Sequence, residues 1–202
     1  MQELTTNPPI FRYKTAIKRP GLSKPVRLAL DHGIIRNNLS FFDYGCGHGR
    51  DVQLLKQEGI DAFGWDPHYF PKKPKREADV VNLGYVLNVI ESEQERVKTL
   101  RNAYRYSRRA LIVSVRTDSP KRDWAEFSDG YLTSRSTFQR FFRDTDLMAM
   151  FRTELGKRVE VSVLCSGIAV IFKNTSLKRS CYSKGGYFSN KLRFVESDRL
   201  LV

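Results

Sequence analysis

The chain has 202 residues, 41% of them hydrophobic, which suits one domain with a buried core. No apolar run approaches the roughly 18–20 residues that cross a bilayer, and the first residues lack the basic and apolar regions of a secretion signal. We therefore predict a cytoplasmic protein without a membrane partner. The 35 Lys and Arg outnumber the 22 Asp and Glu, and the net charge of +13 favours a polyanionic partner, nucleic acid first. A charge excess that serves only solubility is the alternative.

The cysteines at positions 46, 165 and 181 are odd in number and widely spaced. They form no C-x-x-C pair, and no histidines stand near them at zinc-binding spacing. The sequence therefore predicts neither a disulfide nor a metal site.

Residues 1–22 are predicted to form an extended basic arm, because Pro9 and Pro20 interrupt any helix. Basic and aromatic side chains alternate in this arm, a composition that suits phosphate contact and base stacking. An arm that wraps around its own domain is the alternative. The domain itself is predicted over residues 23–173, and a basic tail over residues 174–202.

A helix is predicted from Pro25 to about His32, with Ser23 as its N-cap. After it, segments with strand and helix periodicity alternate along the chain. The expected elements are strand 40–44, helix 49–58, strand 61–66, strand 79–84, helix 92–107 and strand 109–115. This alternation predicts a parallel sheet covered by helices on both faces.

One edge of helix 92–107 is basic. The side chains concerned are Lys98, Arg101, Arg105 and Arg108, at spacings of a single helical stripe. A phosphate-facing surface is one interpretation, and an ordinary solvated face is the other.

Residues 116–134 are predicted to form a loop that acts as a lid or contacts the substrate. Ser136 and Gln139 then form a capping-box pattern, typical of the start of a helix. The remaining expected elements are helix 144–155 and strands 158–164 and 168–173, the last two as an antiparallel hairpin.

The junction between the first strand and its helix is rich in glycine. Residues 43–49 read Asp-Tyr-Gly-Cys-Gly-His-Gly, and Asp66 closes the second strand. Glycines let backbone N–H groups approach a ligand closely, and a carboxylate at the second strand can accept ribose hydroxyls. Arg50 stands where a dinucleotide motif needs its third glycine. The pattern favours a nucleoside that carries an amino acid, S-adenosylmethionine (SAM), although an ordinary tight turn is the alternative.

The segments at 43–49, 65–67 and 78–90 together resemble a family of DNA phosphorothioation-associated methyltransferases. Further similar segments lie at 15–19, 22–27, 129–133 and 137–139, so that the resemblance covers roughly residues 12–173. It implies a Rossmann-like class I SAM-methyltransferase fold, an α/β three-layer sandwich. Its seven-stranded, mostly parallel sheet would end in the antiparallel hairpin. Members of this family continue past this domain. We expect any function carried by that continuation to be absent here, or to be supplied by a partner protein of a DNA-modification system.

The resemblance also implies the residues of the cofactor site. The SAM contacts would fall on Asp43, Gly45, Gly47 and Asp66, with Cys46 inside the same loop. The small size of Cys46 suffices to explain its place there, so nucleophilic chemistry is weakly supported.

Residues 82–85 would then lie at the mouth of the site, where Asn82 and Tyr85 would present the acceptor. In the alternative interpretation, Asn82 binds backbone and Tyr85 packs in the core. Residues 67–78 are too short and proline-rich for the strand and helix that many class I enzymes place there. The adenine contact is therefore open, with stacking by Tyr69 or Phe70 as one solution.

The sequence thus predicts a SAM-dependent methyltransferase acting on nucleic acid, DNA rather than RNA. Two alternatives remain: a non-catalytic nucleic-acid-binding module that keeps the fold, and a methyltransferase for RNA or a small molecule. The acceptor atom, the base preference and the oligomeric state are not indicated.

Overall fold

The structure is a computed structural model that describes residues 8–182. A six-stranded sheet forms its centre, in the order β2-β1-β3-β4-β9-β8. The strands are β1 (Phe41–Tyr44), β2 (Ala62–Trp65), β3 (Ala78–Gly84), β4 (Ser107–Ser114), β8 (Glu160–Cys165) and β9 (Ile168–Phe172). The first four pair in parallel, whereas β9 and β8 form an antiparallel hairpin. The mostly parallel sheet and its final hairpin are confirmed.

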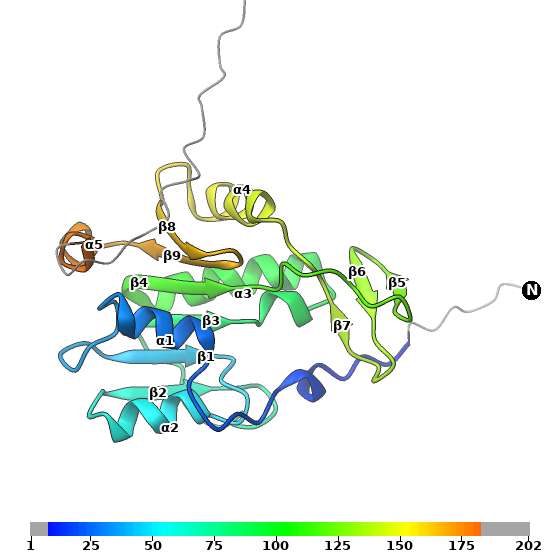
Figure 1. Cartoon of the computed structure of the whole chain (residues 1–202), viewed down its shortest axis with the longest axis horizontal. Coiled ribbons are helices and arrows are strands. Elements are labelled where there is room, and N and C mark those ends of the chain that lie inside the picture. The colour runs from blue at the N-terminus through cyan, green and yellow to red at the C-terminus, as the bar shows by residue number, and fades with distance from the viewer. Residues whose placement is uncertain (1–7, 183–202) are drawn as a thin grey trace, which may run out of the picture.

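Helices cover both faces of this sheet (Figure 1). They are α1 (Lys24–Asp31), α2 (Arg50–Gln57), α3 (Glu93–Tyr106), α4 (Asp144–Leu155) and α5 (Thr175–Tyr182), with short 3-10 turns η1 (Arg12–Thr15) and η2 (Leu87–Val89). Helices α1, α2 and α5 pack on one face, and α3 and α4 pack on the other. The predicted three-layer α/β sandwich is confirmed. Among residues 8–182, no helix combines the length and apolarity that a membrane crossing requires.

The two cores follow from side-chain alternation along buried strands. In β1, Phe41 faces α1 and α2 while its neighbour Phe42 faces α3. In β4, Ile112 and Leu111 alternate in the same way, and all four side chains are fully buried.

Within residues 8–182 the sheet has no seventh strand of the kind that the family resemblance implies, and β2 forms one of its two edges. Residues 66–77 form turns and bends, with only an isolated bridge between Asp66 and Phe70. Pro67, Pro71 and Pro74 remove backbone donors from this short segment, so it cannot supply both a strand and a helix.

A second difference lies in the segment predicted as a loop. Residues 116–134 contain β5 (Ala125–Phe127) and β6 (Gly130–Leu132), which join β7 (Phe138–Gln139) in a small antiparallel sheet. The helix start predicted at Ser136 is wrong: its φ is +55°, and Phe138 pairs with Leu132 in the small sheet. Strand pairing that buries Phe138 outweighs the local capping signal.

The two ends of the domain also differ in detail from the sequence interpretation. Helix α1 begins after Ser23 as predicted, but the Ser23 side chain makes no capping bond. At the other end, the first residues of the predicted basic tail form α5, whose Leu177 and Cys181 are buried in the core. The rest of that tail, residues 183–202, lies outside the described residues, as does the start of the arm, residues 1–7.

Candidate active site

The glycine loop, residues 45–49, joins the carboxyl end of β1 to α2. Gly45 has a φ of +90° and Gly47 a φ of +52°, both in the left-handed region that favours glycine. A Cβ on Gly45 would lie 2.5 Å from Cγ2 of Val86. The loop therefore brings backbone close to a neighbouring segment, and its residues 45–48 line a cleft.

Asp66 fastens this loop to the end of β2. Its Oδ2 accepts from the backbone N–H of Gly47 at 2.9 Å, and its Oδ1 accepts from His68 and Tyr69 at 2.9 and 3.0 Å. Backbone pairing of Gly45 with Trp65 joins the same two elements. The acid thus stands where the sequence placed it, and part of its work is to hold the loop.

Asp43 is a buried carboxylate beneath the loop, with 4% of its surface exposed. Nδ2 of Asn82 donates to its Oδ1 at 2.8 Å. Burial, and then the negative charge of Asp51, raise the pKa of Asp43 from its ordinary 3.8 to about 7. A carboxylate held this way gains from a cationic ligand, because the cation would replace the solvation that burial removes.

The two predicted acceptor residues line the same cleft but have different surroundings. Asn82 is only 2% exposed, and its amide is directed to Asp43. Tyr85 stands at the end of β3 with a φ of +59°, and its backbone N–H donates to the Ser114 carbonyl at 2.9 Å. A non-glycine residue in this region costs on the order of 1–3 kcal/mol and recurs at functional sites. That Asn82 and Tyr85 act on an acceptor stays a prediction.

Cys46 packs the loop onto β2. A Cβ on Gly64 would lie 2.9 Å from the Cys46 Sγ, so the missing side chain makes room for the thiol. Burial and the nearby carboxylates of Asp43 and Asp66 raise the pKa of Cys46 far above its ordinary range. The thiol therefore stays protonated, and nucleophilic chemistry at this position is not supported.

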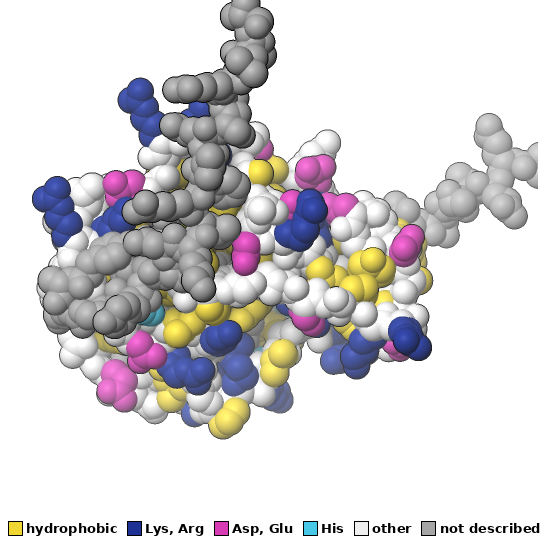
Figure 2. Space-filling model, turned by 45° about the horizontal axis from the view of Figure 1, so that its top comes forward, with side chains coloured by type: hydrophobic (Ala, Val, Ile, Leu, Met, Phe, Trp, Pro, Cys, Tyr) yellow, Lys and Arg dark blue, Asp and Glu magenta, His cyan; other side chains and the backbone are white. Residues whose placement is uncertain are grey.

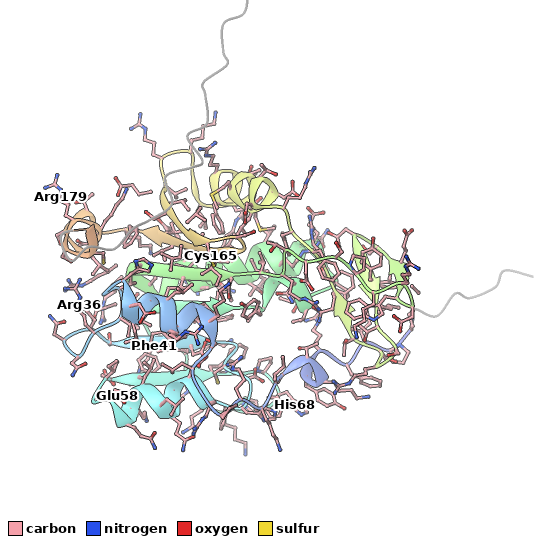
Figure 3. All side chains as sticks on the ribbon, viewed as in Figure 1. Arg36, Phe41, Glu58, His68, Cys165 and Arg179 are labelled. Carbon is pink, nitrogen blue, oxygen red and sulfur yellow. The ribbon has the colours of Figure 1, made fainter. Side chains whose placement is uncertain are left out.

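The arm crosses the end of the sheet at β1 and β2 (Figure 1), and its Tyr13 and Arg19 line the cleft. The ring of Tyr13 stacks on His68 with 4.1 Å between centroids, and the Tyr69 hydroxyl donates to the Tyr13 carbonyl at 3.0 Å. Figure 3 shows His68 at the end of the sheet that the arm crosses, opposite Glu58. Tyr69 also lies against His48 of the glycine loop, with ring centroids 4.2 Å apart. The arm thus wraps around its own domain, which was the alternative to phosphate contact.

Ion pairs hold the arm in place. The Arg12 guanidinium bonds Glu91 at 2.7 and 2.8 Å and Glu95 at 2.5 and 2.7 Å. Arg19 pairs at 3.1 Å with Asp51, which is 3% exposed. Sequence reasoning missed these acids because they lie 32 to 83 residues away from their arginines along the chain, which leaves no local signal.

The small sheet β5-β6-β7 is fastened to α3 by one carboxylate. Asp129 accepts from both Arg96 and Arg140, and the Arg96 side chain is fully buried. Sequence reasoning missed Arg96, although it stands four residues before Leu100 and seven before Ala103, both buried. An arginine on the buried stripe of an amphipathic helix was the available signal.

The loop, the arm and the small sheet line one continuous cleft of about 1460 Å³. Tyr85 and Arg116 lie along it, together with Trp124 beside the small sheet. The Arg116 guanidinium lies 5.7 Å from the Trp124 ring. Within residues 8–182, no three His, Cys, Asp or Glu side chains are grouped as metal ligands.

Comparisons with known proteins identify the fold. No protein-family model and no curated protein matches the chain. Among solved structures, it is similar to the 1,6-didemethyltoxoflavin-N1-methyltransferase of Burkholderia thailandensis, with 13% identity over 75% of this chain and 80% of that one and a TM-score of 0.50. It is also similar to the CcbJ methyltransferase of Streptomyces caelestis, with 12% identity over 79% and 93% and a TM-score of 0.50.

These likenesses show that the chain has the Rossmann-like fold of class I SAM-dependent methyltransferases. At such low identity the fold alone is established. The comparisons support the class I methyltransferase part of the predicted resemblance, and nothing in them supports the phosphorothioation-associated family specifically, which stays a prediction.

Proposed function

We propose that the chain is a SAM-dependent methyltransferase that acts on nucleic acid, with DNA preferred over RNA. The observation that carries the enzymatic part is the buried carboxylate of Asp43 beneath the glycine loop, with Asp66 at the neighbouring strand end. The fold similarity supports the same cofactor, since the didemethyltoxoflavin methyltransferase was crystallised with S-adenosylhomocysteine (SAH).

The residues present fit SAM. Asp43 would hold the ammonium group of the amino-acid part, and the backbone of Gly45 and Gly47, which carries no side chain, would let the cofactor lie close to the loop. A carboxylate offers about four lone-pair sites, and three backbone donors occupy those of Asp66. Asp66 therefore has room for about one ribose hydroxyl.

When bound, SAM supplies an electrophilic methyl group, so the protein needs to align an acceptor rather than provide strong base catalysis. Tyr85 is the side chain we assign to acceptor contact, since it lines the cleft beyond the glycine loop. Asn82 is assigned to positioning, because its buried amide donates to Asp43. The arm and the small sheet would exclude water from the transfer.

The net charge of +13 supports a nucleic-acid acceptor. Figure 2 shows Lys and Arg side chains spread over one face with Asp and Glu among them, so the charge by itself does not locate an interface. A small-molecule acceptor is the second candidate, and it is favoured by the cover that the arm gives the cleft.

Isothermal titration with SAM and SAH tests the cofactor assignment. We expect wild-type protein to bind both, and Asp66→Ala to lose about 100-fold in affinity, because a charged hydrogen bond and the loop geometry are lost together. Glu58→Ala is the matched control, since it removes an exposed carboxylate at the opposite end of the sheet. Equal affinities for both variants would contradict the assignment of Asp66.

Transfer of a radiolabelled methyl group from SAM to single-stranded DNA, duplex DNA or RNA tests the acceptor. Incorporation into DNA supports the full proposal. Cofactor binding with no transfer to any nucleic acid would favour the small-molecule or the non-catalytic alternative. Absence of cofactor binding would overturn the enzymatic proposal.

A further inference from the structure

The edge of the sheet at β2 carries aromatic and basic side chains. Residues 66–77 form neither a helix nor a strand, so in the described part of the chain no helix follows β2 to cover the face of the sheet beyond α3. Phe63 and Trp65 of β2 point to this side, where they remain partly exposed. An edge strand with exposed aromatic side chains is a surface that proteins normally protect.

Basic side chains lie over these rings. The Lys75 ammonium stands 3.6 Å from the centroid of the Trp65 ring, and the Arg76 guanidinium stands 3.9 Å from that of Phe63. The contact of Arg76 with Asp61, at 3.9 Å, is long and exposed on both sides. Cation–π contact holds such charges on the surface without neutralising them, so they stay available to an anion.

Helix α3 contributes two further positive charges, those of Lys98 and Arg105. Lys98 lines the same cleft as Trp65 and Lys75, and Arg105 lies against Tyr106 at 5.6 Å. Neither makes an ion pair with an acid among residues 8–182.

The other members of the basic stripe predicted on this helix are neutralised. Arg101 pairs with Glu154 of α4 at 2.7 Å, and Arg108 pairs with Asp79 at 3.3 Å. The stripe is therefore divided, and only its half beside β2 presents charge without an acidic partner.

We propose that this surface, the basic edge formed by Trp65, Lys75, Arg76, Lys98 and Arg105, binds the sugar–phosphate backbone of a nucleic acid. Four cations, three of them against aromatic rings, complement a chain of phosphates and bases. The cleft runs without interruption from Lys75 and Lys98 to the glycine loop and Tyr85. A nucleic-acid strand bound to the basic edge could therefore extend along the cleft and place a base at the candidate active site. This inference rests on the proposed nucleic-acid acceptor.

Fluorescence anisotropy with a labelled single-stranded DNA of about 20 nucleotides tests the proposal, since this length exceeds the site of a compact binding fold. The informative variant is K98E/R105E. Its matched control is K56E/R179E, which makes the same change in net charge with exposed residues of α2 and α5 on the other helical layer. Thermal melting and titration with SAM show whether each variant keeps its fold and its cofactor site.

We expect K98E/R105E to lose at least about tenfold in affinity for DNA, and the slope of affinity against salt to fall by about 2 between 50 and 200 mM. The control should change by less than about twofold, and cofactor affinity should be the same in both variants. Duplex DNA and RNA, run in parallel, show which strand form the basic edge prefers.

Equal losses in the two variants would overturn the proposal, because net charge alone would then explain binding. So would wild-type protein that binds no nucleic acid, or that binds only anionic lipid vesicles or a second copy of itself. Methyl transfer to DNA that persists in K98E/R105E with unchanged DNA affinity would overturn the basic edge while leaving the proposed function intact.

Discussion

The two ends of the cleft are built in different ways. At the cofactor end, backbone groups of the glycine loop bond directly to β2 and to Asp66. At the acceptor end, the small sheet is held to α3 through Asp129, shared between Arg96 and Arg140. Backbone bonds to β2 thus hold the cofactor end, whereas the link of the acceptor end to α3 depends on one carboxylate shared by two arginines.

The largest expected effect comes from the acceptor end. Asp129→Ala would leave the buried Arg96 and its neighbour Arg140 without their shared acid. We expect the free energy of unfolding to fall by about 3 kcal/mol, because an unpaired buried charge is costly. Urea unfolding measures this loss, and titration with SAM shows whether the cofactor end survives it.

Asp118→Ala is the matched control, since its carboxylate pairs with Arg116 at the surface and is 56% exposed. This variant should change stability by less than about 1 kcal/mol. If both variants lose the same amount, the small sheet does not depend on Asp129, and the contrast between the two ends fails.

Gly45→Ala is expected to perturb the cofactor end of the cleft. The new methyl group would meet Val86 at 2.5 Å, and alanine would have to adopt a φ of +90°. We expect a loss of about 2 kcal/mol in stability together with most of the SAM affinity, measured by thermal melting and calorimetry. Gly21→Ala is the control, because nothing lies within 4 Å of its added methyl group. A loop that tolerates alanine at position 45 would show that close backbone approach is not what binds the cofactor.

The contrast also explains how far the sequence could predict this molecule. The glycine loop and the strands around it were predictable, because glycine spacing and hydrophobic periodicity are local signals. Asp66 was predictable for the same reason, since it follows directly on an apolar strand.

The acceptor end was not predictable in this way. Strands β5, β6 and β7 have two or three residues each, too few for a period to show. Their position depends on Arg96 and Asp129, which are 33 residues apart in the chain. The capping pattern at Ser136 predicted a helix that does not form. Phe138 instead pairs with Leu132, and such pairing cannot be predicted from local sequence.

The raised pKa of Asp43 makes the stability of the cofactor end depend on pH. Its folded-state pKa of about 7 lies above the ordinary 3.8, so the folded protein binds this proton more tightly than the unfolded chain does. Stability from this group should therefore fall as pH rises from about 4 to 7 and then level off. Asp43→Asn should remove that slope, as urea unfolding across this pH range would show.

Binding of an ammonium group beside Asp43 should favour its ionised form. At pH 7 we expect SAM binding to release about half a proton, since the free carboxyl is about half protonated there. Calorimetry in buffers of different ionisation enthalpy measures the release. Binding without proton release would mean that the cofactor's ammonium group does not contact Asp43.

The smallest expected effect concerns the arm, which connects the two ends. Arg12→Ala removes the bonds to Glu91 and Glu95, which are partly exposed, so stability should fall by only about 1 kcal/mol. The dissociation rate of SAM should rise more clearly, because the arm holds Tyr13 over His68 beside the glycine loop. Arg143→Ala, which removes an exposed pair with Asp146 far from the arm, should leave both quantities unchanged. Stopped-flow measurement of dissociation separates the outcomes: equal rates for both variants would mean that the arm is fastened to the domain without closing the cofactor end of the cleft.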